Sequence, residues 1–242
     1  MLQKHRQISS TTKISLVLPC YNPPENWAEV VVDSVASIEA KGLFSVDLII
    51  VNDGSTERVT NESIDFLKAK IPSINVIDYE VNRGKGYALR KGVAVAKQDL
   101  IIYTDIDFPY TEESFMKVYQ GLAQGNDVVP GHRGAAYYAN TPFIRKLISK
   151  SLRWTLKTFL RLPTDDSQCG IKGFNQIGAK VFLDTQIDRF LFDLEFIKLA
   201  SKRKVKFQKA EVTLKPNVVF SKVNFKILAR ESLNFFKVLF RK

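Results

Sequence analysis

The feature that most constrains the fold is an alternation of short apolar runs and amphipathic segments in the first half of the chain. The apolar runs occupy residues 14–18, 46–51, 74–77 and 100–103, with a shorter one at 128–129. Helical patterns lie between them, at 27–40, 62–69, 87–96 and 112–122. Continuous apolar strands separated by helices are typical of a parallel sheet covered on both faces. We therefore predict an α/β fold with a mostly parallel central sheet.

Composition excludes several classes of protein. The 242 residues, 45% apolar and 25% charged, suit one large α/β domain or two small ones, and they exclude disordered, collagen-like and disulfide-scaffold chains. Cys20 and Cys169 are too few for a disulfide framework and lack metal-ligand spacing. No apolar run reaches the ~18 residues of a membrane span, and the polar start lacks the apolar stretch of a secretory signal. We expect a cytoplasmic setting.

The net charge of +11 is concentrated in two segments. Residues 141–163 carry six cations and no acid, and residues 221–242 carry six cations against Glu231. Both show helical periodicity with aromatic residues, a pattern typical of elements that lie on an anionic membrane surface. A solvated basic face on a core helix is the alternative. We expect no nucleic-acid partner, because RNA-binding motifs and zinc fingers are absent.

These segments suggest a domain division and a location. We predict one domain over residues 1–215, followed by a basic amphipathic helical extension over residues 216–242. The protein would then lie peripherally on the inner, cytoplasmic face of the membrane.

Polar clusters follow three of the predicted strands, at 19–22, 52–55 and 104–107. Ligands of parallel sheets bind at the carboxyl ends of the strands, so we expect these clusters to face one crevice. Asp105 and Asp107 could hold Mg²⁺ or Mn²⁺, with water and substrate phosphates completing the shell. The alternative is a turn in which an aspartate caps the next helix.

Several further residues suit phosphate or acid chemistry. The glycine-rich turn 82–86 precedes a helix, so its amides and Lys85 could bind phosphate, and Arg133 could bind another. Asp53 could accept hydrogen bonds from a base or a ribose, or serve a turn. Asp166 could line an acceptor site, and Asp193 and Glu195 are further candidate acids. Cys169 is either a catalytic thiol or a buried small residue.

Taken in order, these motifs resemble glycosyltransferase family 2, and within it the polyprenyl-phosphate sugar transferases such as the dolichol-phosphate mannose and glucose synthases. The resemblance covers about residues 13–240. The motifs are Pro19-x-Tyr21-Asn22, Val51-Asn52-Asp53-Gly54-Ser55, Asn82-x-Gly84-Lys85-Gly86, Asp105-x-Asp107, Gly131-x-Arg133 and Asp166-x-Gln168-Cys169-Gly170-x-Lys172.

The resemblance implies a GT-A fold, a nucleotide-diphosphate hexose donor (UDP or GDP), a divalent metal and inversion at the anomeric carbon. Its motifs place the donor nucleoside against Pro19, Tyr21, Val51 and Asp53. They place Asp105 against the ribose and diphosphate, Asp107 on the metal, and Arg133 on a phosphate. Two positions depart from the family pattern: Pro23 stands where glutamate is usual, and Pro109 where some relatives have a third metal ligand.

The expected acceptor is polyprenyl phosphate. A phosphate monoester ionises near neutral pH, with a second pKa of about 6, and attacks without a general base. A hydroxyl of a glycan or lipopolysaccharide would need one, for which Asp166, Asp193 and Glu195 are the candidates. A nucleotidyltransferase and a non-catalytic module that binds membrane or nucleic acid are the two competing hypotheses. The sequence is silent on oligomeric state.

Overall fold

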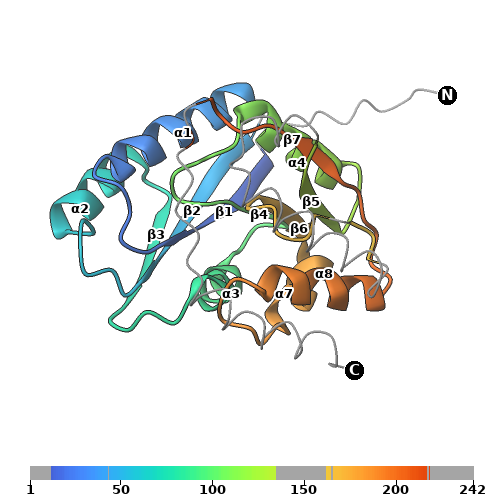
Figure 1. Cartoon of the computed structure of the whole chain (residues 1–242). Coiled ribbons are helices and arrows are strands. Elements are labelled where there is room, and N and C mark those ends of the chain that lie inside the picture. Colours follow the sequence, from blue (N-terminus) through green and yellow to red (C-terminus); the bar gives the residue numbers. More distant parts are fainter. Residues whose placement is uncertain (1–11, 43, 135–161, 165, 217, 219–242) are drawn as a thin grey trace.

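The computed structural model describes residues 12–42, 44–134, 162–164, 166–216 and 218. Seven strands among these residues form one sheet in the order β3-β2-β1-β4-β6-β5-β7 (Figure 1). They are β1 Thr12–Cys20, β2 Phe44–Asp53, β3 Ile74–Tyr79, β4 Leu100–Tyr103, β5 Val128–Arg133, β6 Lys172–Asn175 and β7 Ala210–Val212. Within this sheet β6 runs antiparallel to its neighbours, β4 and β5, whereas the other paired strands are parallel. The predicted α/β fold with a mostly parallel sheet is confirmed.

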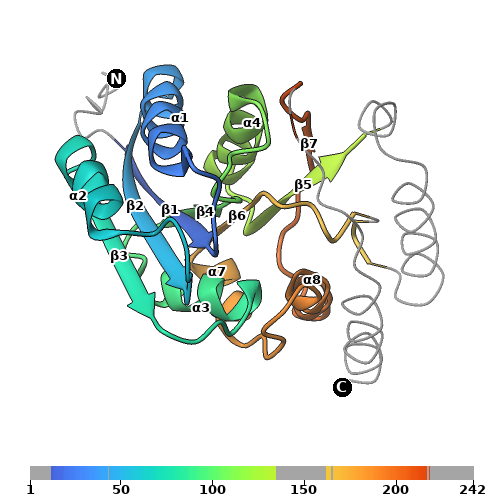
Figure 2. The ribbon, with the colours of Figure 1, turned by 60° about the vertical axis from the view of Figure 1, so that its left-hand side comes forward.

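Helices cover both faces of this sheet (Figure 2). One layer contains α1 Trp27–Lys41, α2 Asn61–Lys70 and α4 Glu112–Ala123, and the other contains α3 Lys85–Val95, α7 Gln176–Leu183 and α8 Phe192–Lys202. Side chains alternate along a strand, so β1 sends Leu16 and Leu18 into the first core and Val17 into the second. The sheet is thus buried on both faces, which explains its continuous apolar runs.

Side-chain caps set the starts of several helices. The Thr60 and Ser63 side chains cap α2 reciprocally, and the Asn175 side chain accepts hydrogen bonds from two amides of α7. Thr111 caps α4 by accepting from the amide of Ser114. The alternative in which an aspartate of 104–107 caps this helix is therefore wrong, and both carboxylates are left for the site.

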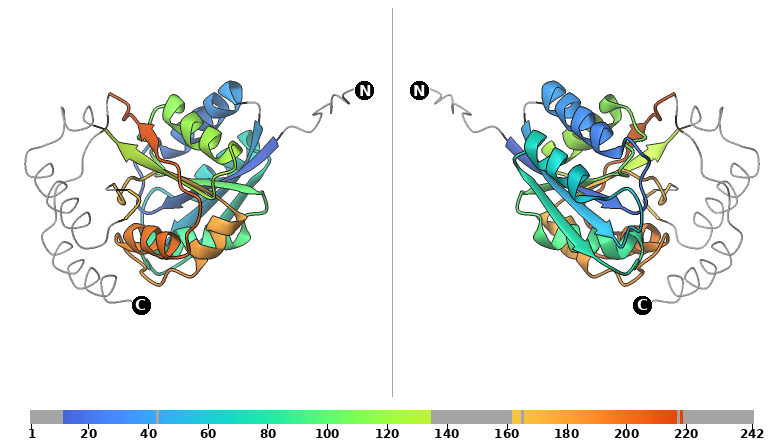
Figure 3. Two further views of the ribbon diagram at one scale, coloured as in Figure 1. Left: turned by 90° about the vertical axis from the view of Figure 1, so that its right-hand side faces the viewer. Right: turned by 90° about the vertical axis from the view of Figure 1, so that its left-hand side faces the viewer.

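Every strand and helix predicted in the first half of the chain is present, with small shifts at the ends. Pro19 and Cys20 belong to β1, and Asn52 and Asp53 belong to β2, although the sequence pattern placed these residues just after the strands. The sequence prediction did not include β6 and β7. These strands extend the sheet beyond β4, as the side views show (Figure 3).

The basic segments 141–163 and 221–242 lie almost wholly outside the described residues, as does most of the extension 216–242. The domain boundary and the membrane-surface helices therefore stay predictions. In the part of the chain that the structure describes, no helix is both long and apolar enough to cross a bilayer.

Candidate active site

A cavity of about 700 Å³ lies where β1, β2 and β4 end. Residues of the three predicted strand-end clusters line it together, so their expected convergence on one crevice is confirmed. The described lining residues are Pro19, Cys20, Tyr21, Asn22, Pro23, Pro24, Asp53, Asn82, Gly84, Lys85, Asp105, Ile106, Asp107, Pro109, Tyr110, Arg133, Gln168, Gly170, Arg189, Phe190, Leu214 and Val218.

Asn22 joins the end of β1 to the turn after β2. It has a left-handed backbone with φ of +43°, a conformation that asparagine tolerates better than most residues. Its amide donates to Ser55 Oγ at 3.0 Å, and its Oδ1 accepts from the amide of Thr56 at 2.9 Å. These bonds join the polar cluster 19–22 to the turn after β2, and Tyr21 stays half-exposed at the cavity.

Asp53 is buried and binds four donors. Its Oδ1 accepts from the Tyr79 hydroxyl at 2.9 Å and the Arg83 amide at 2.8 Å. Its Oδ2 accepts from Asn82 Nδ2 at 2.9 Å and the Gly84 amide at 2.8 Å. Asp53 therefore organises the turn 82–84 from the end of β2, and its contact with the nucleoside stays a prediction.

The glycine-rich turn does not form the expected phosphate cradle. As predicted, a helix, α3, begins at Lys85. The Asp53 carboxylate accepts hydrogen bonds from the amides of Arg83 and Gly84, which precede Lys85. The Asp188 carbonyl accepts from the amides of Gly86 at 2.7 Å and Tyr87 at 3.2 Å, which follow it. The expected phosphate cradle is wrong because acceptors distant in sequence already bind three amides of the turn, those of Arg83, Gly84 and Gly86.

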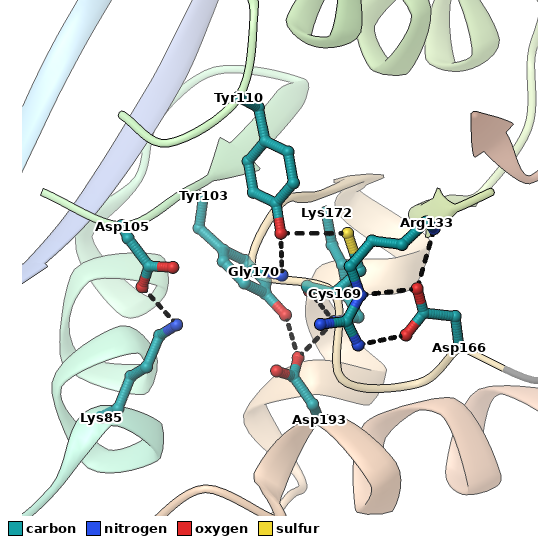
Figure 4. Close-up of polar contacts among 10 residues, drawn as sticks. All are labelled: Lys85, Tyr103, Asp105, Tyr110, Arg133, Asp166, Cys169, Gly170, Lys172 and Asp193. Atoms are coloured by element: carbon teal, nitrogen blue, oxygen red, sulfur yellow. Dashed lines mark hydrogen bonds and ion pairs between the residues drawn. The ribbon is translucent and has the colours of Figure 1, made fainter. Parts of the chain in front are cut away.

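Lys85 reaches across the cavity to Asp105, with 2.5 Å between Nζ and Oδ1 (Figure 4). Burial opposes its charge, but the carboxylates of Asp105 and Asp193 outweigh this and raise the pKa of Lys85. On the other side of Asp105, a Cβ at Gly170 would lie 2.5 Å from Oδ2. Asp105 is thus fixed between a cation and a residue that must lack a side chain, and contact of Lys85 with the donor stays a prediction.

Asp107 lies in the same turn and is exposed to the cavity. Partial loss of water, and then the neighbouring Asp105 carboxylate, raise the pKa of Asp107. Two adjacent carboxylates at the mouth of a cavity suit a hard divalent ion. The described residues contain no group of three or more potential His, Cys, Asp or Glu ligands. The donor set therefore fits a metal that takes its remaining ligands from water and phosphate.

Arg133 extends from the end of β5 and is held by Asp166 (Figure 4). Nε lies 2.8 Å from Oδ2 and Nη2 lies 2.6 Å from Oδ1, and the Arg133 amide also donates to Oδ2. Burial opposes the charge, but the hydrogen bonds and charge of Asp166 raise the pKa of Arg133. Arg133 lines the cavity, whereas Asp166 lies behind it and is 2% exposed.

A buried ion pair supports the loop behind Asp105. Lys172 Nζ lies 2.6 Å from Asp193 Oδ1 and 2.6 Å from the Cys169 carbonyl, and the Tyr103 hydroxyl also donates to Asp193 Oδ1 (Figure 4). The pair joins β6, α8 and the end of β4. Lys172 stood out in the sequence only as part of a motif, and no signal pointed to Asp193 as its partner.

Three other predicted candidates lie outside the cavity. Glu195 Oε2 accepts from the amides of Gln186 and Ile187, each at 2.8 Å, and so braces the loop before α8. Val51 is fully buried and packs on α3 at Gly92, so its predicted nucleoside contact gains no support from the cavity. Cys169 is fully buried and is not among the described residues of the cavity lining, which favours the buried small residue over the catalytic thiol; burial also raises the pKa of its thiol.

The fold, with paired aspartates in a cavity at the strand ends, is that of a GT-A-type glycosyltransferase. The chain belongs to glycosyl transferase family 2, whose sequence model matches residues 15–187.

Relatives of known name agree with this class. The chain is 25% identical over 222 residues to the dolichyl-phosphate beta-glucosyltransferase of Drosophila melanogaster, covering 84% of this chain and 67% of that protein. It is 31% identical over 140 residues to the dolichol-phosphate mannosyltransferase of Pyrococcus furiosus, covering 57% and 38%. The chain spans about two thirds of the length of the beta-glucosyltransferases it matches.

Solved structures share the fold. One is the mannosyl-3-phosphoglycerate synthase of Rubrobacter xylanophilus, with a TM-score of 0.63, 16% identity, and coverage of 95% of this chain and 73% of that one. Another is the glucosyl-3-phosphoglycerate synthase of Mycobacterium tuberculosis in complex with Mn²⁺, uridine-diphosphate-glucose and phosphoglyceric acid. Its TM-score is 0.61 at 16% identity, and the match covers 94% of this chain and 78% of that one.

Proposed function

We propose that this protein transfers a hexose from UDP- or GDP-hexose to a polyprenyl phosphate, with inversion at the anomeric carbon. The names of the relatives support a lipid-phosphate acceptor, since the beta-glucosyltransferases of Drosophila melanogaster and Homo sapiens are both named for dolichyl phosphate. The uridine-diphosphate-glucose complex of a protein with the same fold supports a nucleotide-sugar donor.

The choice of acceptor rests on the contacts of the three candidate general bases, Asp166, Asp193 and Glu195. Asp166 is bound on both oxygens by Arg133, Asp193 is paired with Lys172, and Glu195 binds loop amides. None of the three is among the described residues that line the cavity. A hydroxyl acceptor needs a base that can reach it, whereas an ionised phosphate monoester needs positioning and charge neutralisation. The geometry therefore favours the phosphate.

Asp105 and Asp107 would hold Mg²⁺ or Mn²⁺. When bound, the ion would neutralise the charge that develops on the nucleoside diphosphate as it leaves. Lys85 fixes the orientation of Asp105 from the other side. Tyr21 and Phe190, two half-exposed aromatic residues of the cavity wall, offer flat apolar surfaces to a base, a sugar or an isoprene unit.

Arg133 would contact a phosphate of the acceptor or the donor. Asp166 holds its guanidinium through two side-chain donors, so the Arg133 side chain is already oriented when the reactant arrives. Such preorganisation lets a cation neutralise charge without rearranging during the reaction.

We further propose that the enzyme works peripherally on the cytoplasmic face of an anionic membrane, through the basic segments 141–163 and 221–242. Each cation near such a surface contributes about 1 kcal/mol of attraction. Flotation with anionic and neutral liposomes tests this, and equal failure to bind either would refute it.

The decisive experiment incubates UDP- and GDP-hexoses with Mn²⁺ or Mg²⁺ and a short polyprenyl phosphate. We expect a glycosyl-phospholipid and free nucleoside diphosphate, both lost with EDTA and in Asp107→Asn. Asp65→Asn, which changes an exposed helix carboxylate, is the matched control and should retain full activity. Release of nucleoside diphosphate only with a glycan acceptor would refute the lipid-phosphate acceptor. Release of pyrophosphate would indicate a nucleotidyltransferase, and no turnover or donor binding a non-catalytic module.

A further inference from the structure

Three cations line the cavity among the described residues, and their pairing differs. Lys85 is paired with Asp105, and Arg133 with Asp166. The side chain of Arg189 makes no hydrogen bond or ion pair with any residue that the structure describes, although it is partly buried. The five N–H donors of its guanidinium are therefore available to a ligand in the cavity. The geometry points to an acceptor that arrives with the ligand.

The loop that carries Arg189 is firmly anchored on both sides. The Asp188 carbonyl accepts from two amides of α3, and Arg90 donates to the Ile187 carbonyl at 2.9 Å and pairs with the Asp188 carboxylate. Glu195 binds the amide of Ile187 at 2.8 Å. The backbone beside Arg189 is therefore fixed, which lowers the entropy cost of holding its side chain against a ligand.

Gly84 brings the stem of Arg189 onto the turn that carries Lys85. A Cβ at Gly84 would lie 2.6 Å from the Asp188 carbonyl oxygen and 3.0 Å from Arg189 Cγ, and its φ of +111° also favours glycine. Arg189 thus packs against the turn that carries Lys85, and both residues line the cavity in which the phosphates of the reactants would bind.

We propose that Arg189 binds a phosphate group of a reactant, either the donor diphosphate or the acceptor monoester. This inference rests on the proposed function, because it assumes that both reactants carry phosphate into this cavity. Arginine suits the role because its planar fork matches two phosphate oxygens at once. A contact of this kind contributes enough that its loss lowers affinity on the order of ten- to hundredfold.

The test measures binding by titration calorimetry on the full chain, so it does not depend on turnover. The probes are UDP and GDP with Mn²⁺, citronellyl phosphate, and the phosphate-free citronellol. We expect Arg189→Gln to lower the affinity for the nucleoside diphosphate or for citronellyl phosphate at least about tenfold and to leave the affinity for citronellol unchanged. Arg189→Lys, which keeps the charge, should lose less affinity than Arg189→Gln. The matched control is Arg203→Gln, at the exposed end of α8, which should bind all probes normally.

The outcomes separate the two proposals. Weaker nucleoside diphosphate binding assigns Arg189 to the donor, and weaker citronellyl phosphate binding assigns it to the acceptor. Unchanged affinity for both phosphate probes in a folded Arg189→Gln protein would overturn the inference and leave the proposed function intact. Failure of every nucleotide sugar to glycosylate polyprenyl phosphate would overturn the proposed function, while nucleoside diphosphate binding would still decide the role of Arg189.

Discussion

Replacing Lys172 by methionine should destabilise the protein strongly, because it leaves a carboxylate buried without its cation. The Lys172 side chain is 0% exposed and that of Asp193 is 6% exposed, with 2.6 Å between Nζ and Oδ1. In Lys172→Met the Tyr103 hydroxyl still donates to Asp193, but the charge is no longer compensated and the Cys169 carbonyl loses a donor.

The expected cost follows from the burial of the pair. Removing one partner of a buried ion pair costs about 3–5 kcal/mol of unfolding free energy. For a domain of this size, each kcal/mol lowers the melting temperature by about 2–4 °C, so Lys172→Met should melt roughly 6–20 °C below the wild type. The double variant Lys172→Met/Asp193→Asn removes both charges and keeps an acceptor for Tyr103. It should be more stable than Lys172→Met alone by at least about 1 kcal/mol.

Urea unfolding followed by tryptophan fluorescence measures these free energies. Lys202→Met, which changes an exposed lysine of α8, is the control and should stay within about 0.5 kcal/mol of the wild type. The reasoning would be refuted by a loss below about 1 kcal/mol in Lys172→Met. It would also be refuted if the double variant lost as much unfolding free energy as Lys172→Met and Asp193→Asn, measured separately, lose together.

Three further predictions concern the site. Gly170→Ala should lower kcat strongly in a transfer assay while the melting temperature changes little, because the new Cβ would displace the Asp105 carboxylate; normal turnover would contradict the close approach. Asp53→Asn should weaken calorimetric donor binding and cost about 1–3 kcal/mol of stability, since its amide nitrogen would face donors; wild-type values in both would contradict its organising role. Burial raises the pKa of Cys20 to about 12 and also raises that of Cys169. Ellman's reagent at pH 8 should therefore find no fast thiol in the native protein and two after denaturation.

The sequence predicted those strands whose burial shows as a continuous run of apolar residues. The strands β1, β2 and β4 are largely apolar because helices cover both faces, so their patterns were sufficient. The four residues of β6 begin with a lysine, and a lysine in a buried strand makes sense only with Asp193 in place. The three residues of β7 contain an exposed glutamate and are too few to show a period.

For the site, residue types could be predicted, but their partners could not. Strand-end polar clusters have one common location in a parallel sheet, which is why Asp105 and Asp107 could be assigned to the cavity. The turn 82–86 has the composition of a phosphate loop, yet the Asp53 carboxylate and the Asp188 carbonyl bind its amides. Hydrogen bonds between residues far apart in the chain leave no local pattern, so the expectation failed there.

The partners of the three candidate general bases are likewise visible only in the structure. In the sequence, Asp166, Asp193 and Glu195 are equivalent candidates for a general base. In the structure each carboxylate has a fixed partner, either a cation or backbone amides. A carboxylate held in this way would have to leave its cation or its amides before it could reach the hydroxyl of an acceptor. An enzyme in which these three carboxylates are all bound to cations or amides is suited to an acceptor that arrives already ionised.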